Sequence, residues 1–324
     1  MSRRLTAALV LLLATALPAL AEDWPTRPIT MVVPFAAGGP VDTIARIIGA
    51  GLAEQLGQQI IVENQGGAGG MIASSRVAKS PPDGYIVLLG GSAVLTQNQN
   101  IYKKPLYDGA TDFTFVAMFA DSARILITRK DFPANTLTEF NAYVKANAAK
   151  LQYGSSGLGA GGHVCAVLLD SVSGTKVAHV PYRGAAPALQ DMLGGRIDYM
   201  CEQISTAVSQ IESGNVKAIA VMGLERVQVL PNLPTAAEAG VEGLDCGSWA
   251  AFVFPKGVPD LIVRKLAKAT DDAVESPLVR ERFAKAGVTV PAKARRTPEY
   301  LAKFTPEEIR RWGNAIRSAG ISIE

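Results

Sequence analysis

The sequence predicts an α/β protein built from two domains. Short β-like runs alternate with segments of helical period along almost the whole chain, which is typical of parallel sheets covered by helices on both faces. The 324 residues are enough for two domains of ordinary size. Two glycine-rich loops, PFAAGGPVD and YGSSGLGAGGH, each separate an expected strand from an expected helix. One such loop in each domain is the arrangement expected for a ligand bound between them.

The first part of the chain begins with an apolar strand at residues 29–35. From Val41 to Leu56, apolar side chains then recur at helical spacing until Gly57 stops the pattern. Thr136 and Glu139 form a capping box that opens another helix. The other strands of this part are expected at 59–64, 85–90, 113–119 and 125–130.

The second part continues the alternation and ends in helices. A helix is expected from about residue 161, another at 185–193 and a third from about 205. From about residue 259 the pattern is helical, and Thr305-Pro306-Glu307-Glu308 predicts the start of the last helix. The strands of this part are expected at 151–154, 176–180, 197–200, 216–223 and 249–254.

The first 21 residues have the layout of a secretory signal peptide. Arg3 and Arg4 precede a nearly continuous apolar run, and Ala19-Leu20-Ala21 is a small-x-small cleavage site. The run is shorter than the roughly 20 apolar residues of a membrane span, and Pro18 interrupts it. We therefore expect export to the periplasm with cleavage after Ala21.

Composition argues against several classes of function. Without Arg3 and Arg4, the formal net charge falls from +3 to +1, so no basic surface for nucleic acid is expected. Two histidines and three widely spaced cysteines do not form a metal motif, and no metal or cofactor is expected. An oxidising compartment permits one disulfide among Cys165, Cys201 and Cys246, but buried free thiols are equally compatible with the sequence.

The glycine-rich loops favour binding of a carboxylate. GLGAGG matches the dinucleotide motif formally, but the next strand, KVAHVPYRG, lacks the carboxylate that would hold a ribose. Ser155 and Ser156 are not centred in a G-x-S-x-G motif, and the nearby base, His163, lies in the same helical segment. The free N–H groups at a helix N-terminus, with the adjacent hydroxyls, suit a carboxylate. The alternative is that these glycines only form tight turns.

Several motifs together resemble the Bug-type solute-binding receptors of tripartite tricarboxylate transporters. They are WPTRPITMVVPFAAGGPVDTIAR, GQQIIVENQGGAGGMIASSRVAKSPPDGY, YGSSGLGAGGH, HVPYRGAAPALQDMLGGRIDYM and RVQVLPNLPTAAEAG, in this order over essentially the whole mature chain. The resemblance implies a periplasmic receptor without catalytic activity, with two Rossmann-like α/β domains joined by crossing strands in a Venus-flytrap architecture. It implies domain 1 at 22–123 with 247–324 returning to it, and domain 2 at 124–246.

The same resemblance implies the ligand, the partners and the site. A monomeric receptor would close on a small organic carboxylate and deliver it to the membrane subunits of the transporter. Two alternatives stay open: a receptor that serves a sensor kinase, and a periplasmic hydrolase using Ser155 or Ser156 with His163. The ligand-binding residues carried over or added from the cleft-lining segments are Phe35, Ala37, Gly38, Gly39, Pro40, Ser92, Ser155, Ser156, Gly159, Ala160, Tyr182, Arg183 and Gln203.

The chain departs from the family pattern in both loops. Val41 stands where the family often has Thr, Pro40 has no N–H, and Gly162 stands where a Ser often precedes the His. Fewer donors favour a plain dicarboxylate or an aromatic carboxylate over a hydroxylated one.

Other polar and aromatic side chains have simpler roles. Asp42 is expected to cap the first helix, and His163 to pack in the core. Arg183 either binds a carboxylate or pairs with an acid at the surface. Trp24 and Trp249 are expected in the core.

Overall fold

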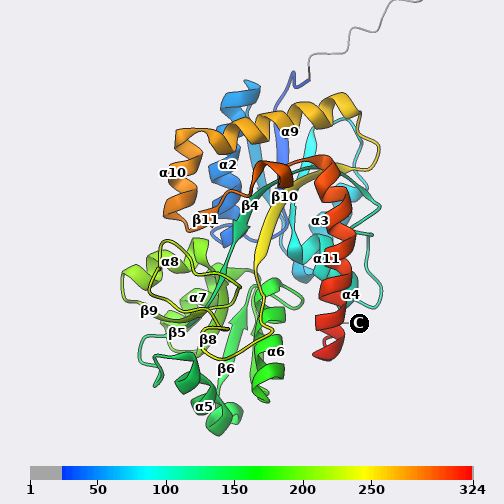
Figure 1. Cartoon of the computed structure of the whole chain (residues 1–324). Helices are drawn as coiled ribbons and strands as arrows, with labels where there is room; N and C mark the ends of the chain where they lie inside the picture. The colour runs from blue at the N-terminus through cyan, green and yellow to red at the C-terminus, as the bar shows by residue number, and fades with distance from the viewer. Residues whose placement is uncertain (1–23, 323–324) are drawn as a thin grey trace, which may run out of the picture.

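The computed structural model describes residues 24–322, which form two mixed sheets, each between two layers of helices (Figure 1). The segment expected to be a signal peptide lies outside the described residues. Among residues 24–322, no helix is long and apolar enough to span a membrane.

The first sheet has six strands in the order β11-β4-β10-β3-β1-β2. β1 lies in the interior and pairs in parallel with β2 and β3, with Ile29 opposite Ile60 and Thr30 opposite Ile86. The strands are β1 (Ile29–Val33), β2 (Ile60–Asn64), β3 (Ile86–Gly91), β4 (Phe113–Ser122), β10 (Ser248–Pro255) and β11 (Val288–Thr289).

Alternation along β1 sends side chains into two cores. Met31 and Val33 pack against α2 (Pro40–Leu56), α9 (Asp260–Glu275) and α10 (Pro277–Lys285), whereas Val32 packs on the opposite face. Gly57 ends α2 in the left-handed conformation with φ of 64°, as its position after the apolar pattern predicts. The opposite face is covered by α3 (Met71–Ala78), the π-helical turn η2 (Ser92–Gln97) with α4 (Asn98–Ile101), and α11 (Pro298–Ser318).

The second sheet has five strands in the order β7-β6-β8-β5-β9. One face packs against α5 (Leu137–Asn147) and α6 (Gly161–Ser173), and the other against α7 (Ala185–Leu193) and α8 (Ile204–Glu212). The N-cap Thr136 accepts a hydrogen bond from Glu139 N at 3.2 Å, as the capping box predicts. The strands are β5 (Arg124–Arg129), β6 (Gln152–Ser155), β7 (Ala178–Pro181), β8 (Tyr199–Gln203) and β9 (Val216–Val221).

The expectation of parallel sheets is only partly correct. β10 is antiparallel to β3 and β4, β11 to β4, and β5 to β8 and β9. The chain leaves the first sheet along β4, enters β5 after Ala123, and returns along β10. Because β4 and β10 carry the chain between the sheets in opposite directions, they pair antiparallel. These crossings lie close to the domain boundaries expected from the sequence. We therefore propose that domain 1 comprises residues 22–123 and 247–324, and domain 2 residues 124–246.

The prediction for the start of the last helix is wrong. α11 begins at Pro298, with Thr297 as N-cap accepting a hydrogen bond from Tyr300 N at 3.1 Å, and Pro306 lies inside the helix. A second Thr-Pro pair upstream provides the same start signal. Buried Leu301 on one side of Pro306 and Trp312 on the other keep both parts of the helix packed, so tertiary contacts outweigh the lost hydrogen bond.

The structure pairs two of the three cysteines. Cys165 on α6 forms a disulfide with Cys246, which precedes β10, while Cys201 on β8 is a buried free thiol. The disulfide therefore ties the segment returning to the first sheet to a helix of the second.

Candidate functional site

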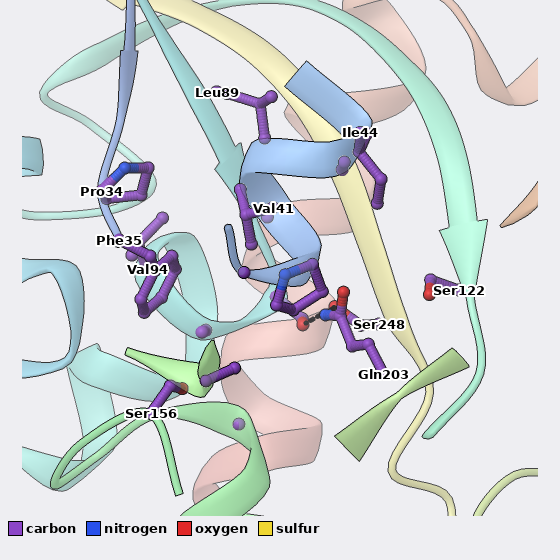
Figure 2. Close-up of a pocket in the computed structure, with 18 of the residues that line it drawn as sticks. Pro34, Phe35, Val41, Ile44, Leu89, Val94, Ser122, Ser156, Gln203 and Ser248 are labelled. Carbon is purple, nitrogen blue, oxygen red and sulfur yellow. Dashed lines mark hydrogen bonds between the residues drawn. The ribbon is translucent and has the colours of Figure 1, made fainter. Parts of the chain in front are cut away.

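A cavity lies between the two sheets where the chain crosses from one to the other (Figure 2). The first sheet contributes the loop after β1, the start of α2, the end of β3 and the start of η2. The second contributes the starts of β5, α6 and α7 and the end of β8. The lining residues are Pro34, Phe35, Ala36, Gly39, Pro40, Val41, Ile44, Leu89, Gly90, Gly91, Ser92, Ala93, Val94, Ala120, Ser122, Arg124, Ser156, Gly161, Gly162, Ala185, Glu202, Gln203, Ser248, Trp249 and Ala250.

Arg124 is the cationic side chain of this wall. It is 6% exposed and lies against Gly161, where an ideal Cβ would be 2.1 Å from Nη2 of Arg124. Within residues 24–322, no hydrogen bond or ion pair engages its guanidinium. Burial lowers the pKa of Arg124, and the charge of Glu202 opposes that shift, but a guanidinium stays protonated at neutral pH. The buried guanidinium of Arg124 has no acceptor from the described chain, so it is available to pair with an anion that enters the cavity.

The N-terminus of α6 adds to the positive potential at Arg124. Ala160 is the N-cap and makes no side-chain cap, and the first intrahelical hydrogen bond runs from Val164 N to Ala160 O at 3.1 Å. The N–H groups of Gly161 and Gly162 precede that bond, so they have no acceptor within the helix. The helix dipole and the guanidinium act at the same place, which makes this end of the cavity suited to a carboxylate.

Glu202 is the acidic side chain of the wall. It is 4% exposed, and its Oε1 accepts a hydrogen bond from Thr206 Oγ1 at 2.9 Å. Burial raises the pKa of Glu202, while the charge of Arg124 opposes the rise. Glu202 pairs with Ile125 across the ladder, whereas Arg124 pairs with Gln203, so Glu202 and Arg124 point to opposite faces of the sheet.

Uncharged polar groups continue the wall next to Arg124. Gln203 Nε2 lies 3.1 Å from Ser248 Oγ, which lies 3.1 Å from Ser92 Oγ, and Figure 2 shows Gln203 and Ser248 in contact. Gln203 Oε1, Ser122 Oγ and Trp249 Nε1 are buried without a partner in the described chain. Buried polar atoms are normally hydrogen-bonded, so these groups mark places for ligand or water.

The side formed by the first sheet is largely apolar. Phe35, Val41, Ile44, Leu89 and Val94 lie together on this side in Figure 2. The start of α2 offers fewer donors than that of α6, because Pro40 at its first position has no N–H, which leaves the N–H groups of Val41 and Asp42 ahead of the first intrahelical bond from Thr43 N to Gly39 O.

Asp42 has a different position from the one expected. The N-cap of α2 is Gly39, and Asp42 lies in the first turn. Its Oδ2 accepts hydrogen bonds from Gly38 N and Arg46 Nε, both at 2.9 Å. Burial raises the pKa of Asp42, but these hydrogen bonds outweigh that effect, and the pKa is lowered overall. The carboxylate thus occupies the positive end of α2 itself.

The structure divides the residues predicted for the site. Six line the cavity: Phe35, Gly39, Pro40, Ser92, Ser156 and Gln203. The others lie outside its wall: Ala37, Gly38, Ser155, Gly159, Ala160, Tyr182 and Arg183. Tyr182 Oη donates to Asp191 Oδ2 at 2.7 Å. Arg183 is exposed and has no ion pair in the described chain, so the expected surface pairing with an acid is not observed, while its role toward a carboxylate stays a prediction.

Sequence reasoning missed Arg124, Glu202, Ser122 and Ser248. The sequence held one signal for Arg124: this arginine comes directly before the apolar run ILIT, and an arginine is unusual in a buried strand. Trp249, expected in the core, is 6% exposed and serves both the core and the cavity wall. Trp24 is buried in the core as expected.

Of the two serines considered for a hydrolase, Ser156 lines the cavity and Ser155 has other partners. Ser155 Oγ lies 2.7 Å from His179 Nε2 and donates to Gly157 O at 2.9 Å. His163, the proposed base, instead accepts a hydrogen bond from Gly159 N at its Nδ1. Ser155 is 2% exposed and lies outside the cavity wall, and a contact between Ser155 and a ligand stays a prediction. No group of three or more His, Cys, Asp or Glu within residues 24–322 could hold a metal ion.

Comparison with known proteins identifies the family. The sequence model of the tripartite tricarboxylate transporter family receptor matches residues 44–321. The chain belongs to this receptor family. A UPF0065 protein from the TAR-I ttuE-ttuC' intergenic region of Agrobacterium vitis is 39% identical over 314 residues, which are 96% of this chain and 90% of that protein. This confirms the family expected from the motifs.

Solved structures of related receptors share the architecture. The periplasmic binding protein BugD is 38% identical with a TM-score of 0.89, covering 93% of this chain and 100% of its own. MatC from Rhodopseudomonas palustris, with bound malate, is 39% identical with a TM-score of 0.87, covering 90% and 100%. The tripartite tricarboxylate transporter receptor described here is thus a Bug-type solute-binding protein with the two-domain periplasmic-binding-protein fold, and not an enzyme.

Proposed function

We propose that this receptor captures a small organic carboxylate in the cavity between its domains and delivers it to a tripartite tricarboxylate-type importer. The observation that carries the proposal is Arg124, a buried guanidinium without a protein acceptor at the N-terminus of α6. A carboxylate is the ligand group that satisfies both the guanidinium and the free helix N–H groups. MatC, a relative with malate bound, shows that this family includes carboxylate receptors.

Closure of the domains would complete the site. Ala36, from the first sheet's side, lies so close to Gly184, before α7, that a Cβ on Gly184 would be 2.7 Å from the Cβ of Ala36. Tyr102 Oη likewise donates to Leu158 O across the two halves at 3.4 Å. A ligand that contacts both halves stabilises the closed form over an open one, and closure is then a shift in population.

Capture and delivery also require export of the chain and a membrane partner. The chain would be exported with its signal peptide cleaved after Ala21, act as a monomer in the periplasm, and bind the membrane subunits of the transporter. For the ligand-binding residues we propose the cavity wall, with Arg124 as anchor and Ser156, Ser92 and Gln203 as polar contacts.

The test is a binding titration with a panel of organic acids, first by thermal shift and then by calorimetry. At least one acid should raise the melting temperature, because a ligand that binds the folded state stabilises it. Arg124→Gln should weaken binding of that acid about 30- to 150-fold, since a charge-assisted pair contributes about 2 to 3 kcal/mol. Arg183→Gln, which removes an exposed arginine outside the wall, is the matched control and should change affinity less than about twofold.

Two results would contradict the proposal. If no organic acid binds, capture of a carboxylate is wrong. If a strain lacking the gene takes up the bound acid as well as its parent does, delivery to an importer is wrong, and the sensing alternative gains support. The melting temperature of each variant without ligand shows whether the fold is kept.

A further inference from the structure

We infer that the ligand of this receptor carries a single carboxylate, held at Arg124, on a body that is mostly apolar. This inference rests on the proposed function and specifies its ligand class. It departs from the dicarboxylate seen in MatC, whose bound malate has a carboxylate at each end. The difference lies in what the wall offers to a second carboxylate.

The charges of the wall accommodate one carboxylate. Among the described residues that line the cavity, Arg124 is the only cationic side chain, and Glu202 is the only acidic one. One carboxylate at Arg124 pairs the buried guanidinium. A second would enter a buried space without a cation and in the presence of Glu202, and an unpaired buried charge is strongly unfavourable.

The wall opposite Arg124 offers a second carboxylate fewer donors than a helix start without proline would, although the N–H groups of Val41 and Asp42 have no acceptor within α2. The loop after β1 leads into Pro40, which has no N–H, and then into Val41, which has no hydroxyl. The positive end of α2 is occupied by the carboxylate of Asp42, which is bound to Gly38 N and Arg46 Nε. A second ligand carboxylate would therefore face a position that the protein has filled with its own.

The same side provides apolar surface for the rest of the ligand. This side of the cavity is lined by Phe35, Val41, Ile44, Leu89 and Val94, which are labelled in Figure 2. An apolar group of the ligand that packs against these side chains is removed from water, which favours binding. An aromatic ring or a branched aliphatic chain has the right chemistry for this space.

Gln203 and Ser122 allow an uncharged polar substituent near the carboxylate. Arg124 and Gln203 are directly paired across β5 and β8, so their side chains leave the sheet on the same face. Gln203 Oε1 and Ser122 Oγ are more than nine-tenths buried and have no partner in the described chain. A hydroxyl or amide group next to the carboxylate could donate to Gln203 Oε1 and accept from Ser122 Oγ without bringing a second charge, whereas a keto group could only accept from Ser122 Oγ.

The experiment compares matched ligands that differ by one carboxylate. Calorimetric titrations would use hexanoate against adipate and benzoate against terephthalate, with hexanamide and benzamide as uncharged controls. We expect the better monocarboxylate to bind at least tenfold more tightly than its dicarboxylate, and its amide to lose at least 30-fold. The loss from acid to amide should vanish in Arg124→Gln.

Val41→Thr provides a second readout in a protein that keeps Arg124. It restores a hydroxyl at the start of α2 with little change in side-chain volume, so the preference for the monocarboxylate should shrink. Equal or tighter binding of the dicarboxylates by the unchanged protein would overturn the inference but leave the proposed function intact. Binding of neither acid nor of any other carboxylate would instead overturn the proposed function.

Discussion

The guanidinium of Arg124 occupies the space in which a side chain of Gly161 would stand. An ideal Cβ on Gly161 would lie 2.1 Å from Nη2 and 2.8 Å from Cζ of Arg124. The first residue of α6 is therefore free of a side chain where the only cationic group of the described cavity wall comes closest to the helix N-terminus. This contact brings together two sources of positive potential that lie 37 residues apart in the chain (161 − 124).

Gly161→Ala should reduce ligand affinity without removing any polar group. The new methyl group would displace the guanidinium from the helix N-terminus, so we expect a loss of about tenfold or more, equivalent to about 1.4 kcal/mol. Calorimetry with the best acid from the panel measures the change. Gly223→Ala is the control, because its Cβ would have Val221 Cγ1 as its nearest neighbour at 3.9 Å. Unchanged affinity in Gly161→Ala would show that the position of Arg124 is not important for binding.

Two glycines of α2 should respond oppositely to alanine. A Cβ on Gly51 would lie 2.7 Å from Val279 Cγ2 and 3.1 Å from Ala273 Cβ, so Gly51→Ala overpacks the contact of α2 with α9 and α10. We expect a loss of about 1–3 kcal/mol of unfolding free energy in urea. A Cβ on Gly49 would meet its nearest atoms at 3.7 Å, so Gly49→Ala should gain about 0.5–1 kcal/mol from helix propensity. Similar effects at both positions would contradict this packing.

The disulfide should stabilise the protein substantially. Cys165 and Cys246 close a loop with a sequence separation of 81, for which the chain-entropy estimate is about 4.5 kcal/mol. Reduction should lower the unfolding midpoint of the natural protein, and it should have no effect on Cys246→Ala.

Thiol labelling gives an independent check of the pairing. Cys201 is buried, and burial raises its pKa to about 12, so it should resist alkylation in the folded state. Mass spectrometry of the unfolded, unreduced protein should find one alkylated cysteine, and three would show that the disulfide is absent.

The stacked histidines should make the fold sensitive to mild acid. The rings of His163 and His179 lie 4.3 Å apart between centroids, and burial lowers their pKa values to about 4 and about 3. Below the unfolded pKa of about 6.5, the unfolded chain binds protons that the folded one does not. Each histidine should therefore cost up to about 2 kcal/mol of stability by pH 5.

Urea unfolding at several pH values between 6.5 and 5 measures this effect. His179→Gln should show a shallower loss over this range, in which most carboxyl groups remain ionised. The same slope in both proteins would mean that His179 does not contribute to the pH dependence.

The sequence by itself determined much of the fold. Period-2 and helical patterns place most of the strands and helices, because the residues of each element record which of its faces is buried, but α3, α4 and β11 were not predicted. Gly57 and Thr136 mark helix ends through local backbone chemistry, and they do so in the structure. The start of α11 was misplaced because two Thr-Pro pairs give the same local signal, and only packing on both sides of Pro306 decides between them.

The composition of the cavity was decided by tertiary structure. The glycine-rich loops are visible in the sequence, and Phe35, Gly39, Pro40, Ser92, Ser156 and Gln203 do line the cavity. Arg124 was not found, because its proximity to Gly161 depends on how β5 and α6 are placed in the second domain. Backbone turns are local properties of the chain, whereas burial of a charge beside a helix N-terminus arises only when distant segments pack together.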